Sequence, residues 1–242
     1  MKMDNSVKVT LIVVVGVIVL GLVISSSIRN AGANTVSVTG QSTIDVMPDL
    51  VAVYFMVSTT GATSKEAADK NSNITQALTN ALLAQGFDQS EIETQSYSVY
   101  PEYDYSSSSQ RLKDYLATHS IKVKIDANNT GKIGDVVNAG ISAGAGISYI
   151  DFELTQESQN TYKKEALAQA SQDATSKAQA VAQGLGKNLG SLVSVTVNDY
   201  NYMPWLAYNA AGATTAEVQK AAPSIQPSTQ QVTASVTAVY RI

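Results

Sequence analysis

Hydrophobic and polar positions form one unbroken apolar run near the start of the chain and regular alternation after residue 34. The run covers residues 9–28, which carry no charge and are mostly Val, Ile and Leu. A helix of that length spans about 30 Å, the thickness of a membrane hydrocarbon core. The segment has no polar face, which a helix on a soluble core would show. The pattern therefore predicts a membrane helix, with apolar positions Val9, Ile12, Val15, Val19, Leu22, Ile24 and Ile28.

Two interpretations of this segment remain open, a retained anchor and a cleaved signal peptide. Residues 31–33 read Ala-Gly-Ala, a small-x-small sequence that a signal peptidase accepts. Against cleavage, the apolar run is long for a signal peptide, and Arg29 lies between it and that sequence. We favour the anchor. Lys2 and Lys8 on one side outnumber Arg29 on the other, so we expect a cytoplasmic N-terminus and a domain on the extracytoplasmic side, in the periplasm or at the cell surface.

Alternation of period two predicts several strands after the apolar run. Val36, Val38 and Gly40 alternate with polar residues, as in a half-buried strand. Residues 50–57 are apolar at nearly every position, which predicts a strand covered on both faces. A hairpin is predicted from residues 91–105 and 115–126, and single strands from 147–157 and 192–197. The final strand, 232–242, places five residues on one face: Val232, Ala234, Val236, Ala238 and Tyr240.

Three segments have the period of a helix. The first begins at Thr63 and Glu66, whose spacing is that of a capping box, and ends at Gly86. The second covers residues 129–144. The third, residues 161–183, has an alanine every four residues, which lets a helix lie close to a sheet: Ala166, Ala170, Ala174 and Ala178.

The predicted order of elements is ββαββαβαββ, which indicates an α+β fold with helices packed on a mostly antiparallel sheet. We expect residues 1–30 to form a cytoplasmic tip and anchor, 31–35 a linker, and 36–242 a single domain.

An aromatic stretch within residues 200–230 has no regular period and is predicted as a long loop. We interpret it as a contact surface, because solvent-exposed loops are normally polar. Three partners remain open for it: its own core, as a lid; a neighbouring subunit; or the membrane interface. The membrane is the least favoured, because Pro204 interrupts a helix and Lys220 is the one basic residue. The candidate contact residues are Tyr200, Tyr202, Met203, Trp205, Leu206 and Tyr208.

Composition argues against several classes of function. The chain has no cysteine, so disulfides, thiol catalysis and cysteine metal sites are excluded. A net charge of -4 does not suit a nucleic-acid partner. The single histidine, His119, shares the parity of Ile121, which predicts a hydrogen-bonded core or interface histidine rather than a catalytic base. Asp151 and Glu153 share a strand face, either as a carboxylate pair or as a solvated face.

Two further ligand motifs are incomplete. The glycines at 140, 144 and 146 follow a helix and precede a strand, the reverse of a phosphate loop. No Asp-x-Asp-x-Asp-Gly sequence indicates a calcium loop. We therefore predict no cofactor, no metal and no catalytic residue.

An ordered set of short motifs resembles the SIMPL domain family over about residues 35 to 242. The set opens with Val36-x-Val38-x-Gly40 and the Pro48-Asp49 turn. Where the family often has a Pro-Gly turn before its last strand, this chain has Pro227-Ser228. The motifs between are Lys65-Glu66-Ala67-Ala68, Gly86, Thr94, Tyr97, Pro101-Glu102-Tyr103, Glu165-Ala166-Leu167, Asp173-Ala174, Leu185-Gly186, Leu189-Gly190 and a closing strand that ends Val239-Tyr240.

The resemblance implies an envelope protein without a catalytic motif, because the family's shared glycines, prolines and core residues serve the fold. Bacterial members of the family include periplasmic and stress-related proteins and look like ring- or barrel-forming oligomers. We therefore expect a non-enzymatic, membrane-anchored scaffold that forms a homo-oligomer, with an unidentified protein partner left open. The alternative is an envelope ligand-binding module, or a small enzyme, whose site is formed at the oligomer interface.

Overall fold

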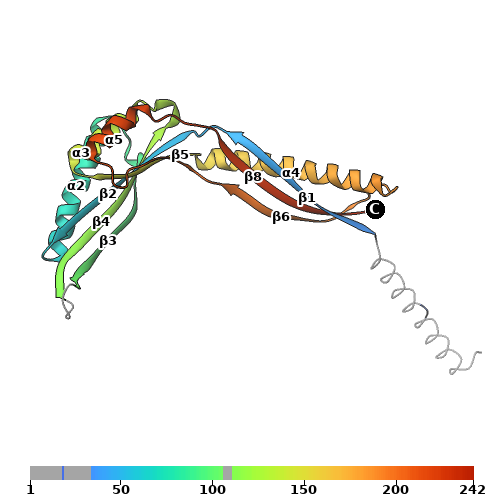
Figure 1. Ribbon diagram of the computed structural model, residues 1–242, viewed down its shortest axis with the longest axis horizontal. Helices are drawn as coiled ribbons and strands as arrows, with labels where there is room; N and C mark the ends of the chain where they lie inside the picture. The colour runs from blue at the N-terminus through green and yellow to red at the C-terminus, as the bar shows by residue number, and fades with distance from the viewer. Residues whose placement is uncertain (1–17, 19–33, 106–110) are drawn as a thin grey trace, which may run out of the picture. The chain divides into compact units, whose positions relative to one another are not determined.

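The structure is a computed structural model that describes residue 18, residues 34–105 and residues 111–242, with element labels as in Figure 1. These residues form two compact units. Unit 1 comprises the described part of Met1–Ser42 together with Glu165–Tyr200 and Thr233–Ile242. Unit 2 comprises Thr43–Lys164 and Asn201–Val232. The sequence predicted one domain after the linker. Each of the two units is built from segments that are not contiguous in the chain.

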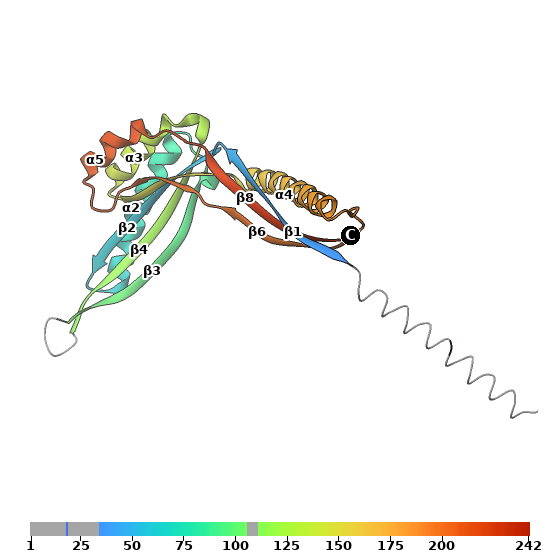
Figure 2. The ribbon, with the colours of Figure 1, turned by 45° about the vertical axis from the view of Figure 1, so that its right-hand side comes forward.

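Unit 2 contains a five-stranded antiparallel sheet in the order β3-β4-β2-β5-β7. Figure 2 shows β3, β4 and β2 side by side. The predicted hairpin is confirmed, since β3 pairs with β4 along most of its length. Bulges interrupt the register of β2 with β5 and of β5 with β7. The strands are β2 (Leu50–Gly61), β3 (Ile92–Asp104), β4 (Arg111–Asp126), β5 (Gly146–Glu153) and β7 (Trp205–Asn209).

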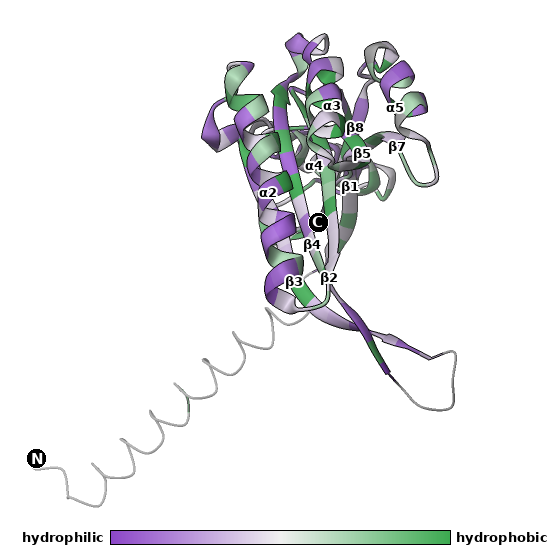
Figure 3. Cartoon of the chain, turned by 90° about the vertical axis from the view of Figure 1, so that its left-hand side faces the viewer, coloured by the Kyte–Doolittle hydropathy of each residue, from purple (hydrophilic) through white to green (hydrophobic). Residues whose placement is uncertain are grey.

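Helices cover one face of this sheet. Helix α2 (Ser64–Ala84) packs on β2 and β4, and α3 (Lys132–Ala143) packs beside α2, with α5 (Thr215–Ala221) next to α3. Figure 3 shows hydrophobic and hydrophilic residues alternating along α2, as the amphipathic pattern requires. The Thr63 side chain accepts a hydrogen bond from the Glu66 amide, so the predicted start of α2 is confirmed. Short 3-10 turns occur at Gln89–Glu91, Ala127–Asn129 and Ala222–Ser224.

Helices cover only one face of β2, and the opposite face is covered in part, since Ala52 there is also fully buried. The prediction of coverage on both faces is therefore only partly right. Val53 and Phe55 are fully buried beneath the helices. On the opposite face Tyr54 is half-buried and Met56 is 40% exposed. Tyr and Met are counted as apolar, so the hydrophobic pattern did not show that Tyr54 and Met56 alternate with the core residues. This open face carries the polar residues described below.

Unit 1 is built from one helix and a three-stranded sheet in the order β1-β8-β6. The sheet contains parts of β1 (Thr35–Val46), β6 (Leu192–Tyr202) and β8 (Gln230–Arg241), and the helix is part of α4 (Gln156–Gly184). The predicted alanine stripe of α4 is confirmed, since Ala166, Ala170, Ala174 and Ala178 are fully buried. A methyl group on Gly40 of β1 would lie 2.0 Å from the Ala170 carbonyl oxygen, so only glycine fits there.

Two predicted boundaries are wrong. Helix α4 begins at Gln156 rather than at 161, and β5 ends at Glu153 rather than at 157, because Thr155 caps the helix instead of extending the strand.

The predicted loop at 200–230 contains β7 and α5, so the observed order is ββαββαβαββαβ. Both elements are short, and neither carries enough periods of hydrophobic alternation to be recognised.

The predicted membrane segment lies outside the described residues except for Ile18, which is in a helical conformation. Among the residues that the structure describes, no helix is both long enough and apolar enough to cross a membrane. The seven anchor positions from Val9 to Ile28 therefore stay a prediction.

Candidate functional site

His119 is held by hydroxyl groups on both sides of its ring. Strand β4 places it opposite Val57, on the helix-covered face. Its Nδ1 lies 3.1 Å from the Thr75 hydroxyl, and its Nε2 lies 2.9 Å from the Thr94 hydroxyl. Burial lowers the pKa of His119, which favours the neutral ring. The predicted hydrogen bonds of His119 are thus present, but the side chain is half-buried rather than in the core. Its hydrogen-bond partners in the described part of the chain are hydroxyl groups, whereas a catalytic triad has a carboxylate in this place.

The open face of the unit 2 sheet carries a connected polar network. Lys122 Nζ lies 2.6 Å from Glu153 Oε2, and both side chains are only 12% exposed. The Tyr54 hydroxyl donates to Glu153 Oε1 over 2.8 Å, and the Tyr54 ring stacks on Tyr149 with 4.2 Å between centroids. Burial, together with the hydrogen bond to Glu153, raises the pKa of Tyr54 well above its usual range. Tyr54 therefore stays protonated and acts as a donor rather than as a base.

Asp151 lies on the same face as Glu153 but does not share its partners. Its Oδ1 atom is buried and has no hydrogen-bond partner among the described residues. Burial raises the pKa of Asp151 to about 6, and the negative charge of Glu153 adds to the shift. The two carboxylates are thus unequal: Glu153 is paired with Lys122, whereas Asp151 is a half-buried acceptor. This arrangement matches neither a solvated face nor a symmetrical carboxylate pair.

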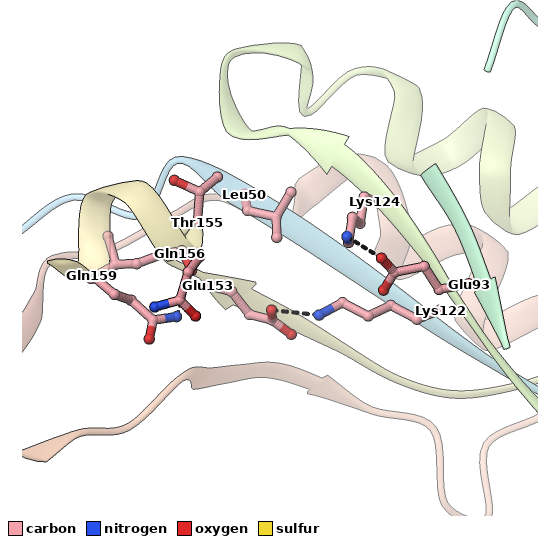
Figure 4. A pocket seen from close by; sticks show the side chains of 9 residues that line it. Leu50, Glu93, Lys122, Lys124, Glu153, Thr155, Gln156 and Gln159 are labelled. Atoms are coloured by element: carbon pink, nitrogen blue, oxygen red, sulfur yellow. Dashed lines mark hydrogen bonds and ion pairs between the residues drawn. The ribbon is translucent and has the colours of Figure 1, made fainter. Parts of the chain in front are cut away.

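A pocket of about 300 Å³ lies at one end of this face (Figure 4). Two ion pairs line it, Lys122–Glu153 and Lys124–Glu93, and Figure 4 shows each lysine directed at its own carboxylate. The rest of the lining is apolar or uncharged: Leu50, Leu154, Thr155, Gln156 and Gln159. Because the four charges neutralise one another in pairs, the pocket offers amide and hydroxyl contacts but no unpaired base or nucleophile.

Asp49 closes the N-terminus of α4 beside this pocket. Its Oδ1 accepts from the Thr155 amide over 2.7 Å, and its Oδ2 accepts from the Thr155 hydroxyl and the Ser158 hydroxyl. Burial alone would raise the pKa of Asp49, but the hydrogen bonds from Ser158 and Thr155 outweigh it and the pKa is lowered. The carboxylate thus fills the position that an external anion would take at a helix N-terminus. The Pro48-Asp49 turn consequently has a structural role.

The other ligand motifs are accounted for by packing. A methyl group on Gly140 would lie 2.0 Å from the Phe55 ring, so this glycine allows α3 to approach the sheet. Gly144 has a φ of 90° and ends α3 in the left-handed conformation. Within residues 34–105 and 111–242, no group of three His, Asp or Glu side chains is arranged to hold a metal ion.

The candidate contact residues of the aromatic stretch fall into two sets. Tyr202 and Tyr208 are partly buried, and the Tyr202 hydroxyl oxygen accepts from the Leu154 amide. In contrast, Met203 is 72% exposed and Leu206 is 50% exposed. Trp205 stacks on Phe152 with 5.6 Å between ring centroids, yet remains 39% exposed. Tyr200 is partly buried. The segment therefore folds partly onto its own unit, and Met203, Trp205 and Leu206 stay available for contact.

The network around Lys122 was not predicted from the sequence. Alternation on β4 correctly directs Lys122 away from Ile121, but its partner Glu153 lies on β5, 31 residues later. Strand β2 lies between β4 and β5, and the Lys122 side chain reaches across β2 to Glu153. A signal was present in Tyr54, a hydrogen-bonding residue in an otherwise apolar strand.

Comparisons with known proteins agree with the motifs. The SIMPL family model, described as a protein of unknown function (DUF541), matches residues 36–240. The uncharacterized protein YggE of Edwardsiella ictaluri is 27% identical over 169 residues, which cover 68% of each chain. A 26 kDa periplasmic immunogenic protein of Brucella melitensis is 25% identical, over 66% of this chain and 65% of the relative. The uncharacterized protein YggE of Escherichia coli is 26% identical, over 68% of this chain and 66% of the relative.

Proposed function

The chain belongs to the SIMPL family, and from this premise we propose that it is a non-enzymatic, membrane-anchored scaffold that self-assembles on the extracytoplasmic side of a membrane. The periplasmic name of the Brucella relative supports the compartment. The uncharged run at residues 9–28 supports the anchor. The family resemblance supports a ring- or barrel-like oligomer with an envelope or stress-related role.

The observation that carries self-assembly is the exposed apolar surface at β7. Met203, Trp205 and Leu206 lie at or beside an edge strand of the unit 2 sheet, and each is at least 39% exposed. Trp and Met are favoured anchors at protein interfaces, where the centre of the contact excludes water. Catalysis has less support, because the charged groups around the unit 2 pocket neutralise one another in pairs.

Light scattering on the full-length protein in detergent tests the proposal. We expect a particle of several chains, and we expect Trp205→Ala to reduce its mass at least two-fold while the circular dichroism spectrum is kept. Met203→Lys repeats the test at a position with less intramolecular packing. Leu112→Ala, at a 50% exposed residue of β4, is the matched control and should leave the mass unchanged. A single-chain particle for the unaltered protein would refute self-assembly.

One observation favours the alternative of an envelope ligand-binding module. The buried, unpartnered Oδ1 of Asp151 is an acceptor that a bound donor group would satisfy. Native mass spectrometry of the purified particle would then detect a small molecule that is lost in Asp151→Asn. Under the scaffold proposal we expect the mass of the protein chains alone in both proteins.

A further inference from the structure

Strand β6 is an open edge of the unit 1 sheet. Among the strands that the structure describes, it is bonded to β8 alone. Every residue from Leu192 to Asn198 is exposed. None of these seven residues is charged, and none is proline. Its exposed large side chains are Leu192 (52%), Val193 (51%), Val195 (55%) and Val197 (56%).

The other edge strands are protected in ways that β6 is not. Along β1, Lys177 Nζ donates to the Thr39 carbonyl, and the Gln41 amide donates to Asp173 Oδ2, so side chains of α4 satisfy this edge. Strand β3 carries Pro101 and two glutamates, and β7 is only five residues long. Charges, prolines and short length are the usual devices that prevent edge-to-edge pairing. Residues 192–198 of β6 have none of these devices, and the first charge of the strand is Asp199.

The three valines of β6 lie on the face of the sheet that α4 covers elsewhere. Asn198 donates to the Thr237 hydroxyl, which also bonds Thr39, so these three side chains share one face. Gly40 follows Thr39 and contacts α4 on the opposite face. By alternation, Val193, Val195 and Val197 point to the α4 side. The corresponding residues of β8 are almost fully buried, at 1–4% exposure: Ala234, Val236 and Ala238.

We propose that β6 pairs antiparallel with β6 of a second copy of this chain, about a two-fold axis through Val195. This inference deepens the proposed self-assembly and rests on it. The pair joins two three-stranded sheets into one of six strands. Val195 faces its own counterpart, and Val193 faces Val197 of the second copy, so the valine row is self-complementary.

A second copy fits this edge better than a different protein would. The sequence Val-x-Val-x-Val reads the same in both directions, as a two-fold axis requires. Residues 192–198 are uncharged, so two copies do not repel each other and a charged partner finds no complement. Cross-strand pairs of β-branched residues contribute about 0.2–1 kcal/mol each, in addition to the new backbone hydrogen bonds.

Cysteine cross-linking tests this register directly, because the chain has no cysteine of its own. Directly opposite residues of an antiparallel pair have Cα atoms about 4.5–5.5 Å apart, within the range for a disulfide. Full-length Val195→Cys in detergent should therefore oxidise to a covalent dimer. The Val193→Cys protein should not, since its two copies lie about 13 Å apart in this register. The same holds for Val197→Cys.

An equimolar mixture of Val193→Cys and Val197→Cys should form the covalent dimer that neither forms alone. Parallel pairing would instead cross-link all three single variants, and would overturn the proposal. Leu112→Cys, equally exposed on β4, serves as the control for random collision. If the particle contains several chains but Val195→Cys stays uncross-linked, the β6 pairing is refuted and self-assembly stands. If the particle is a single chain, both fail.

A charge at the axis provides a second readout that does not depend on oxidation. Val195→Lys places two ammonium groups opposite each other and should reduce the particle mass at least two-fold. The side chain is 55% exposed, so the circular dichroism spectrum should be unchanged. Leu112→Lys is the matched control. Retention of the full mass by Val195→Lys would contradict the proposal.

Discussion

Asp151 is a half-buried carboxylate beside a second negative charge, that of Glu153. Its pKa is raised to about 6 from an ordinary value of 3.8, first by burial and then by Glu153. The folded protein therefore binds a proton more tightly at this group than the unfolded chain does. The contribution of Asp151 to stability is fully present below about pH 4 and is lost as the pH rises through about 6.

Asp151→Asn removes this loss of folding stability at higher pH, because a neutral amide does not ionise. We expect the variant to be more stable than the unaltered protein by about 1 kcal/mol at pH 7.5, the scale of one unsatisfied buried polar group. The difference should shrink towards zero at pH 4, where Asp151 is already mostly protonated. Urea unfolding at the two pH values measures it. An equal difference at both pH values would contradict the argument.

Gly40 shows how one residue fixes the contact between two elements. Helix α4 approaches β1 so closely that an added methyl group would lie 2.0 Å from the Ala170 carbonyl and 2.8 Å from the Ala174 methyl group. Neither neighbour is a flexible side chain, so the helix itself would have to move. The glycine and the alanine stripe therefore act together to bring the backbones of helix and strand into contact.

We expect Gly40→Ala to destabilise the protein by about 1–3 kcal/mol, the usual cost of overpacking. Gly184→Ala, at the last residue of the same helix, meets no atom within 4 Å and should be neutral or slightly stabilising. Thermal unfolding of the two variants measures the difference. Equal midpoints for both variants would show that the close approach of α4 is not required.

The elements also show which features the sequence could predict. Long periodic segments were recognised, because the alanine stripe of α4 and the alternation of β8 extend over many residues. The site was not recognised. Lys122 and Glu153 meet across β2, because Lys122 lies opposite Tyr54 and Glu153 lies opposite Leu50. Periodicity along one strand carries no information about such a register.

At the scale of the whole molecule, assembly depends on whether residues 9–28 are retained or cleaved. A retained helix at residues 9–28 would tether every copy to one membrane, and tethering raises the effective concentration of β6 edges for one another. Weak edge pairing would then suffice for assembly. A cleaved segment would release the copies, and assembly would depend on the affinity of the soluble chains alone.

Mass spectrometry of the native protein distinguishes the two cases. We expect the N-terminal peptide to begin at Met1, because Arg29 lies between the apolar run and the Ala-Gly-Ala sequence. A mature terminus at Asn34 would refute the anchor. Ala33→Leu is the control, because a large residue at the last position of a cleavage sequence blocks a signal peptidase but not general proteolysis. With a retained anchor, the unaltered protein and Ala33→Leu both begin at Met1 and stay with the membrane in alkaline carbonate. We expect a chain that starts at Asn34 to be soluble in water.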